Sequence, residues 1–171
     1  PKNFMDQSMT FFLNSAWPHL LSRVYGERLI HVSTDCVFDG RKGVPYVESD
    51  PPNAKDIYGL SKSLGEPFDR SLVLRTSIIG PELFGDISLL EWLRHARGPV
   101  PGYTNHLWNG VTTKQLALSV RTILHSRREF PKKGLYHVFS DAHSKYEVLS
   151  MLKEKYALAV HIRKDTKTAP I

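Results

Sequence analysis

The sequence is poor in three features that define large classes of protein. Of its 171 residues only Cys36 is a cysteine, which excludes an internal disulfide framework and a cysteine-based zinc cluster. No apolar run approaches the roughly 18 residues of a membrane span, and the N-terminus has no signal-peptide layout. The 11 glycines and 11 prolines are ordinary, which excludes collagen-like and low-complexity chains. We therefore expect a globular protein of the reducing cytoplasm with no membrane partner.

The net charge of +6 is spread unevenly along the chain. Residues 1–70 carry 8 Lys or Arg against 9 Asp or Glu, whereas residues 111–171 carry 12 against 5. No basic stretch in the second region interleaves Arg with aromatic residues, as single-strand binders do. The pairs Arg127–Arg128 and Lys132–Lys133 are typical of a solvated helix end and loop. Nucleic acid is therefore not an expected partner, although a basic face can attract a phosphate-bearing small molecule.

The apolar positions of residues 5–16 recur at the three-to-four spacing of a helix with one buried face. These positions are Met5, Met9, Phe12, Leu13 and Ala16. Pro18 is expected to kink or restart this helix, and Gly26 is expected to end it.

Short β-rich runs then alternate with helical patterns, which favours an α/β fold with a parallel sheet. The expected strands are residues 28–33, 71–76, 134–140 and 159–163. A helix is expected over 57–70, and three more begin with capping boxes. The boxes pair Ser88 with Glu91, Thr112 with Gln115 and Ser144 with Glu147. Residues 35–56 form a long loop, a kind of segment that is usually functional or disordered.

Two strands in the first half make a poor sheet, which leaves two interpretations. The chain is either a small complete α/β domain or part of a larger one whose N-terminal strands are absent. The sequence contains no G-x-x-G-x-x-G phosphate-binding turn.

Tyr58 and Lys62 lie four residues apart at the start of a predicted helix, so both side chains share one face. An ammonium beside a phenol lowers a pKa that begins at about 10. Such a tyrosine can give a proton to a carbonyl that is being reduced, or take one from an alcohol that is being oxidised. The pair alone arises by chance about 0.5 times in a chain of this composition, so a solvated surface pair is the alternative.

Ser33 and Thr34 end the strand that precedes the long loop. Ligands of open α/β sheets bind outside the carboxyl ends of strands, where these hydroxyls could donate to a substrate oxygen. A hydroxyl turn that merely closes the strand is the alternative.

Four segments, in order, resemble the signature of one family. They are residues 33–40 (STDCVFDG), 43–50 (GVPYVESD), 58–66 (YGLSKSLGE) and 74–77 (LRTS). From about Asn14 to Asp141 the chain resembles the extended short-chain dehydrogenase/reductases, in the branch typified by dTDP-4-dehydrorhamnose reductase. The resemblance implies the C-terminal part of a Rossmann-type parallel sheet, with the N-terminal dinucleotide-binding strands absent.

The resemblance further implies a partial cofactor domain in residues 1–80 and a small α/β substrate-binding portion in residues 81–171. The helix Thr112–Arg128 and the strand Gly134–Ser140 would pack on the Rossmann sheet. Without the glycine-rich turn, these 171 residues alone are expected neither to bind NAD(P)H nor to reduce a sugar. Exposed sheet edges would lead them to aggregate or to need a partner chain, for which a homodimer is one arrangement.

The catalytic residues implied by the resemblance are Thr34, Tyr58 and Lys62. Tyr58 would protonate the C4 ketone oxygen of a nucleotide-linked sugar, Lys62 would bind the nicotinamide ribose, and Thr34 would bind the substrate oxygen. The residues expected at the cofactor, NADPH or NADH, are Tyr58, Lys62, Thr76, Ser77 and Ile78. Those expected at the nucleotide-sugar substrate are Ser33, Thr34, Asp35, Cys36 and Ile78.

Two residues depart from the family pattern. Cys36 stands where the branch commonly has an aromatic residue, and Ile78 stands where the rhamnose reductases carry a tryptophan. Both changes affect which sugar would be bound and not the hydride transfer. The sequence thus predicts a reductase of a nucleotide-linked 4-keto sugar in cell-surface polysaccharide synthesis. An epimerase or dehydratase of the same family, and a non-catalytic binding subunit such as the regulatory subunit of methionine adenosyltransferase, are the alternatives.

No metal is expected, because the eight histidines show neither the H-x-x-x-H spacing nor the carboxylate pairing typical of a zinc site. The polar and aromatic segment 102–110 is either a packed loop between domains or a contact for the nucleotide-sugar.

Overall fold

The structure is a computed structural model that describes residues 6–126 and 128–166. Met5 and Arg127, named above, lie outside the described residues. The chain forms two compact units. Unit 1 runs to Ser77 and takes in residues 119–138, whereas unit 2 comprises residues 78–118 and the chain from residue 139 onward. Among the described residues, no helix has the length and apolar character needed to cross a membrane.

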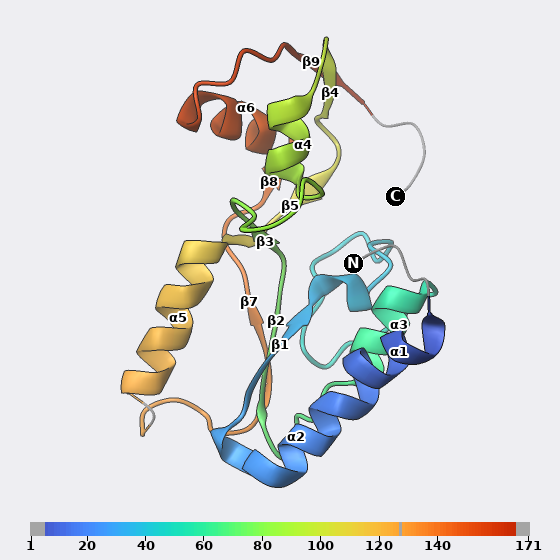
Figure 1. Ribbon diagram of the computed structural model, residues 1–171, viewed down its shortest axis with the longest axis vertical. Helices are drawn as coiled ribbons and strands as arrows, with labels where there is room; N and C mark the ends of the chain where they lie inside the picture. The colour runs from blue at the N-terminus through green and yellow to red at the C-terminus, as the bar shows by residue number, and fades with distance from the viewer. Residues whose placement is uncertain (1–5, 127, 167–171) are drawn as a thin grey trace. The chain divides into compact units, whose positions relative to one another are not determined.

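Unit 1 is built on a three-stranded parallel sheet (Figure 1). The order is β1 (Ile30–Thr34), β2 (Leu72–Thr76) and β7 (Gly134–Val138). Every residue of the central strand is buried, as is typical of a parallel strand covered on both faces. The strands begin and end within two residues of their predicted bounds, and the expected α/β class is confirmed.

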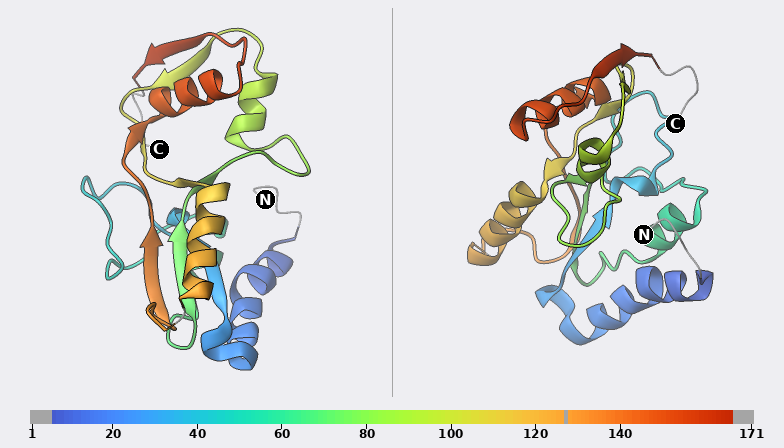
Figure 2. Two further views of the ribbon diagram at one scale, coloured as in Figure 1. Left: turned by 90° about the vertical axis from the view of Figure 1, so that its left-hand side faces the viewer. Right: turned by 45° about the horizontal axis from the view of Figure 1, so that its top comes forward.

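The strand register sorts side chains onto two faces of this sheet. Ser33 pairs with Arg75, which pairs with His137, so these three side chains share one face. On the opposite face, Leu72 and Leu74 form a small core with Ile123 of α5 (Thr113–His125). Figures 1 and 2 show α5 on one side of the sheet and the other helices of unit 1 on the opposite side. Helix α5 ends at His125, three residues before the predicted end at Arg128.

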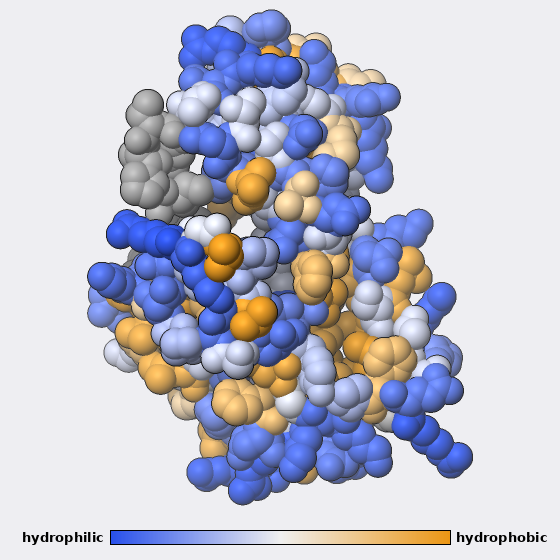
Figure 3. Space-filling model, turned by 180° about the vertical axis from the view of Figure 1, so that it is seen from behind, coloured by the Kyte–Doolittle hydropathy of each residue, from blue (hydrophilic) through white to orange (hydrophobic). Residues whose placement is uncertain are grey.

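The N-terminal helix contradicts the predicted buried stripe. It comprises α1 (Gln7–Phe11), a wide π-helical turn (Phe12–Ala16) and α2 (Trp17–Tyr25). Met9, Phe12 and Leu13 are each about half exposed. The extra residue in a π turn rotates the following side chains, so a pattern with a period of 3.6 does not keep one face. Figure 3 shows orange, apolar residues on the surface among blue, hydrophilic ones.

The inner side of this helix is small and polar instead. The Asn14 amide donates to the Ser61 hydroxyl at 3.0 Å, and the Ser15 hydroxyl donates to the Ser61 carbonyl at 2.7 Å. A methyl group at Gly65 would overlap the Asn14 carbonyl. Two backbones therefore approach closely here, which large apolar side chains would prevent. Pro18 lies in the first turn of α2, where regular α-helix resumes after the π turn and a missing N–H is tolerated, so the predicted restart of the helix is confirmed.

The helix expected over residues 57–70 is shorter, since α3 spans Ile57–Leu64. Its first turn is capped by Asp56, whose carboxylate accepts from the Gly59 N–H at 3.0 Å. Gly65 forms the C-cap, and Pro67 two residues later is unable to continue the helix.

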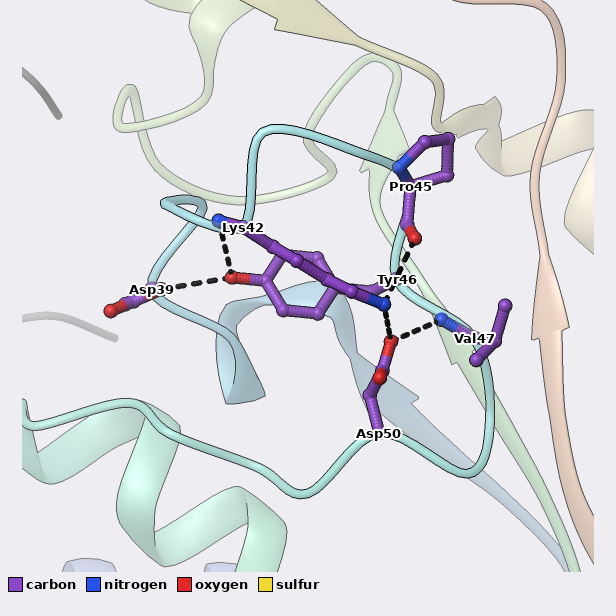
Figure 4. Close-up of polar contacts among 6 residues, drawn as sticks. All are labelled: Asp39, Lys42, Pro45, Tyr46, Val47 and Asp50. Atoms are coloured by element: carbon purple, nitrogen blue, oxygen red, sulfur yellow. Dashed lines mark hydrogen bonds and ion pairs between the residues drawn. The ribbon is translucent and has the colours of Figure 1, made fainter.

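The long loop is ordered rather than disordered, and Figure 4 shows why. The Tyr46 hydroxyl donates to Asp39 at 2.9 Å and accepts from the Lys42 N–H at 3.2 Å. The Lys42 ammonium forms an ion pair with Asp50. The Tyr46 ring stacks on Phe38 with ring centres 4.1 Å apart. We call residues 38–54 the clasp loop.

Replacing Tyr46 by Phe should lower the melting temperature by a few degrees at neutral pH, because two hydrogen bonds are lost while the ring stack remains. Hydrogen bonds from the Arg41 N–H and then the Tyr46 hydroxyl hold the pKa of Asp39 below its usual value. A lowered carboxyl pKa stabilises above the unfolded-state pKa, and that stabilisation is lost as pH falls through the folded-state pKa. Thermal unfolding should therefore show the difference shrinking in acid. Tyr25→Phe, on an exposed ring, is the control. An equal loss of melting temperature in both variants would show that the Tyr46 hydroxyl does not stabilise the clasp loop.

Unit 2 has its own core beneath two helices. Helix α4 (Leu89–His95) and helix α6 (Lys145–Lys155) pack with the parallel pair β4 (Val100–Tyr103) and β9 (Ile162–Asp165). The last strand thus begins later than the predicted residues 159–163. Short pairs complete the unit: β3 (Ile78–Ile79) with β6 (Val111–Thr112), and β5 (Leu107–Trp108) with β8 (His143–Ser144).

The three predicted capping hydroxyls all accept the expected backbone hydrogen bond. The Ser88 hydroxyl accepts from the Glu91 N–H, the Thr112 hydroxyl from the Gln115 N–H and the Ser144 hydroxyl from the Glu147 N–H. The Ser144 box is complete, because the Glu147 carboxylate also accepts from the Ser144 N–H.

Candidate functional site

The end of β1 presents Thr34, which caps a short 3₁₀ turn over Asp35–Val37. The buried Thr34 hydroxyl accepts from the Cys36 N–H at 3.2 Å and donates to the Asp35 carboxylate at 3.2 Å. Asp35 and Cys36 are exposed. The turn thus holds one hydroxyl inward and offers a carboxylate and a thiol to a ligand.

Gly59 brings α3 against this turn. A methyl group at Gly59 would overlap the Cys36 carbonyl oxygen and the Ala54 side chain. Without a side chain there, the first turn of α3 reaches the backbone of the 3₁₀ turn, and Tyr58 forms a hydrogen bond with the Thr34 side chain. The long loop between the two motifs therefore returns Tyr58 to Thr34.

Tyr58 behaves differently from the sequence-based expectation. Burial is the main cause that raises the pKa of its phenol, and the nearby Cys36, Asp35 and Asp56 raise it further. The hydrogen bond to Thr34 opposes this shift. The expectation that Lys62 lowers the Tyr58 pKa is therefore wrong for this structure, in which the phenol stays protonated.

Lys62 lies on the same helix, but its ammonium is engaged elsewhere. Its Nζ donates to the carbonyl oxygen of Val32 in β1 at 3.1 Å. Burial lowers the pKa of Lys62, and the charge of Glu66 partly restores it. Burial, with the positive charges of Lys62 and His19, also lowers the pKa of His31 to about 4, so that His31 is neutral at physiological pH.

Ser33 faces the other side of β1 from Thr34. Its hydroxyl donates to the buried Glu66 carboxylate at 2.6 Å, and Arg75 binds the same carboxylate through two hydrogen bonds of 2.9 and 2.7 Å. Because strand side chains alternate between faces, Ser33 is committed to the interior. This corrects the expectation that Ser33 contacts substrate.

The remaining predicted cofactor residues follow β2. The Thr76 hydroxyl donates to the Val138 carbonyl at 2.9 Å and so ties β2 to β7. Ser77 ends this part of unit 1. Ile78 belongs to unit 2, where it is half exposed and pairs with Val111. The roles of these residues at a cofactor or sugar stay predictions.

One group of metal-ligand types in the described chain was missed by sequence reasoning. Asp86, Glu91 and His95 place ligand atoms within 4.8 Å of one another. The signal was the carboxylate and imidazole four residues apart on α4. The Glu91 carboxylate already accepts from Arg94 at 2.8 Å, and His95 Nδ1 lies 2.9 Å from the Glu91 carbonyl. Glu91 and His95 therefore each have a partner within α4.

The parallel sheet with helices on both faces, and hydroxyl groups gathered where β1 ends, define a Rossmann-like α/β protein. The sequence matches the RmlD substrate binding domain family over residues 20–170. The chain belongs to this family, which confirms the resemblance drawn from the four motifs.

Similar proteins agree with this assignment. Spore coat polysaccharide biosynthesis protein SpsK of Bacillus subtilis (strain 168) is 31% identical over 144 residues, covering 80% of this chain and 49% of SpsK. Methionine adenosyltransferase 2 subunit beta of Danio rerio is 44% identical over 71 residues, covering 39% of this chain and 20% of that protein.

Among solved structures, dTDP-4-dehydrorhamnose reductase of Bacillus anthracis in complex with NADP has the same fold. The TM-score is 0.74 at 20% identity, over 94% of this chain and 59% of that chain. The chain thus spans about half the length of SpsK and somewhat more of the Bacillus anthracis enzyme.

Proposed function

We propose that the natural protein containing this chain reduces the keto group of a nucleotide-linked 4-keto sugar, with NADPH or NADH as hydride donor, in the synthesis of cell-surface polysaccharide. The observation that carries the proposal is the close approach of α3 to the 3₁₀ turn at Gly59, which brings Tyr58 to Thr34 where β1 ends, beside the exposed Asp35 and Cys36. Membership of the RmlD family and the NADP complex of a protein with the same fold support it.

The chemistry assigned to Tyr58 is general acid catalysis. When bound, the nicotinamide supplies a hydride to C4. The Thr34 hydroxyl exchanges the Asp35 carboxylate for the ketone oxygen and holds it together with the Tyr58 hydroxyl. This oxygen gains negative charge as the C4–H bond forms, and the Tyr58 proton passes to it. The raised pKa of Tyr58 favours the neutral phenol that this step requires.

Lys62 has a binding role in this proposal. Its ammonium suits the ribose hydroxyls next to the nicotinamide. This role requires its Nζ to exchange the Val32 carbonyl for a new partner. The donor set fits the nicotinamide end of the cofactor, whereas the sequence has no glycine-rich turn for the pyrophosphate. The proposed substrate contacts are Thr34, Asp35, Cys36 and Ile78.

Two other functions fit the same family. An epimerase or dehydratase would return the hydride and consume no cofactor. The other candidate is a binding subunit without turnover, which the similarity to methionine adenosyltransferase 2 subunit beta favours. The Ser-Thr-Asp sequence at residues 33–35 favours the reductase.

The test uses the natural protein with any sequence that flanks this chain. It is mixed with NADPH or NADH and a panel of dTDP-, UDP- and GDP-linked 4-keto sugars, and cofactor oxidation and sugar product are measured. We expect one reduced cofactor to be consumed for each sugar reduced. Product without net cofactor consumption identifies an epimerase or dehydratase, and binding without product identifies a binding subunit; either result rejects the reductase.

The same panel tests sugar choice. Because Cys36 and Ile78 replace aromatic residues of the family pattern, dTDP-4-keto-rhamnose should be a poor substrate, by about 10–200-fold in kcat/KM. Ile78→Trp should narrow that gap. If dTDP-4-keto-rhamnose is the best sugar of the panel for the unaltered protein, the assignment of these two positions is wrong.

A further inference from the structure

Glu66 lies at the centre of a buried network that the reaction does not use directly. Only 5% of Glu66 and 3% of Arg75 are exposed. The Glu66 carboxylate accepts one hydrogen bond from Ser33 and two from Arg75. The Arg75 guanidinium also stacks on the ring of Phe38, 5.0 Å from its centre. The network therefore joins β1, β2, the end of α3 and the clasp loop.

Stability does not by itself explain such a pair. A buried ion pair loses its hydration on folding, and well-packed apolar residues of similar volume are often as stabilising or more so. Its position in the chain is more informative. Ser33 precedes Thr34, Arg75 precedes Thr76, and Glu66 follows Lys62 by four residues. One carboxylate thus holds the backbone segments that carry the proposed catalytic groups.

We infer that Glu66 is a positioning residue that fixes Thr34 and Lys62 relative to each other, through Ser33 and Arg75 on one side and the end of α3 on the other. This inference rests on the proposed function for its kinetic effect, but its structural core does not depend on which reaction is catalysed. A reactive group displaced by about 1 Å can lose about 10²-fold in rate.

Glu66 also acts on Lys62 through charge. Its carboxylate supports the charged form of Lys62 against burial. The other titratable groups near Lys62 are Tyr58 on its own helix and His31 on β1, and His31 in turn interacts with His19 of α2. His31 is neutral with a pKa of about 4, so Glu66 is the negative charge that acts on this ammonium.

The experiment removes both charges together, because Glu66→Gln alone strands the Arg75 charge in the interior and can unfold the protein. The double variant Glu66→Leu/Arg75→Met keeps similar volumes and leaves the Phe38 ring a side chain to pack on. The control is Asp69→Asn/Arg70→Gln, which removes the same two charges from an exposed pair on the same segment. Melting temperature, kcat, both KM values and the pH profile are measured in the natural protein.

We expect the double variant to melt a few degrees below the unaltered protein, because the buried Ser33 hydroxyl loses its acceptor. Its kcat should be about 10–100-fold lower, and both KM values should change much less. The alkaline limb of its pH profile should move to lower pH, because Lys62 loses its proton more readily without Glu66. The control should change none of these. A double variant that is stable and retains full kcat with an unshifted limb overturns the inference.

A second measurement separates this inference from the proposed function. The titration of isotope-labelled lysine is followed by NMR in the unaltered and the double-variant protein. A lower pKa for Lys62 in the double variant supports the coupling whatever the protein catalyses, and an unchanged pKa rejects it. Absence of reductase activity in the unaltered protein rejects the proposed function alone.

Discussion

Replacing Tyr58 by Phe should lower kcat by about 10²–10⁴-fold, which is the range for loss of a general acid. The variant keeps the ring and its packing but removes the proton donor and the hydrogen bond to Thr34. KM for the cofactor should change little, because a phenyl ring still fills the same place. The measurement is steady-state kinetics of the natural protein with the best sugar of the panel.

Two further variants make the Tyr58 result specific. Tyr25→Phe removes a hydroxyl from a half-exposed ring and should leave kcat unchanged. Lys62→Met should lower kcat and also raise KM for the cofactor, because Lys62 is proposed to contact the ribose. Near-normal turnover in Tyr58→Phe would show that another group donates the proton.

The sequence was sufficient to predict the pairing of Thr34 with Tyr58. Strand ends and helix starts are local properties of the chain, and the carboxyl ends of parallel strands are where ligand groups gather. Thr34 stands at such a strand end, and Tyr58 stands in the first turn of the helix that follows β1 along the chain, so the two are expected close together once the fold class is correct. The α/β class followed from alternating apolar patterns in the same way.

The outward stripe of the N-terminal helix was not predictable by the same means. Its apolar residues have the right spacing, but the π turn at Phe12–Ala16 changes the phase of the helix. The face that packs on α3 is selected by close backbone approach at Gly65, where Asn14 and Ser15 fit and large residues do not. Which face of the helix packs on α3 therefore depends on tertiary contacts and not on the periodicity of its apolar residues.

Register explains the other failures. Ser33 is far from Glu66 and Arg75 in the chain, and the pairing of Ser33 with Arg75 places these two side chains on one face of the sheet, where both bind the Glu66 carboxylate. A hydroxyl at a strand end looks available to substrate until that register is known. The prediction of a lowered Tyr58 pKa was wrong for a related reason. Helix spacing places Lys62 on the same face as Tyr58, but the Lys62 ammonium donates its hydrogen bond to the Val32 carbonyl.

Replacing Gly59 by Ala should have two opposing effects on the stability of the fold, and these effects differ in size. In an exposed helix the change would stabilise by about 1 kcal/mol. Here the new methyl group would overlap the backbone carbonyl of Cys36 and the side chain of Ala54, neither of which can rotate away. Overpacking of this kind typically destabilises by about 1–3 kcal/mol, so the net effect should be a lower melting temperature.

The larger effect of Gly59→Ala should appear in catalysis. Relief of the overlap moves the first turn of α3 away from the 3₁₀ turn, which separates Tyr58 from Thr34, and a shift of about 1 Å can lower kcat by about 10²-fold. Thermal unfolding and kinetics of the natural protein measure the two effects, with Leu60→Ala on the exposed side of the same turn as control. A Gly59→Ala protein that is both more stable and fully active would show that α3 does not need this close approach to place its tyrosine.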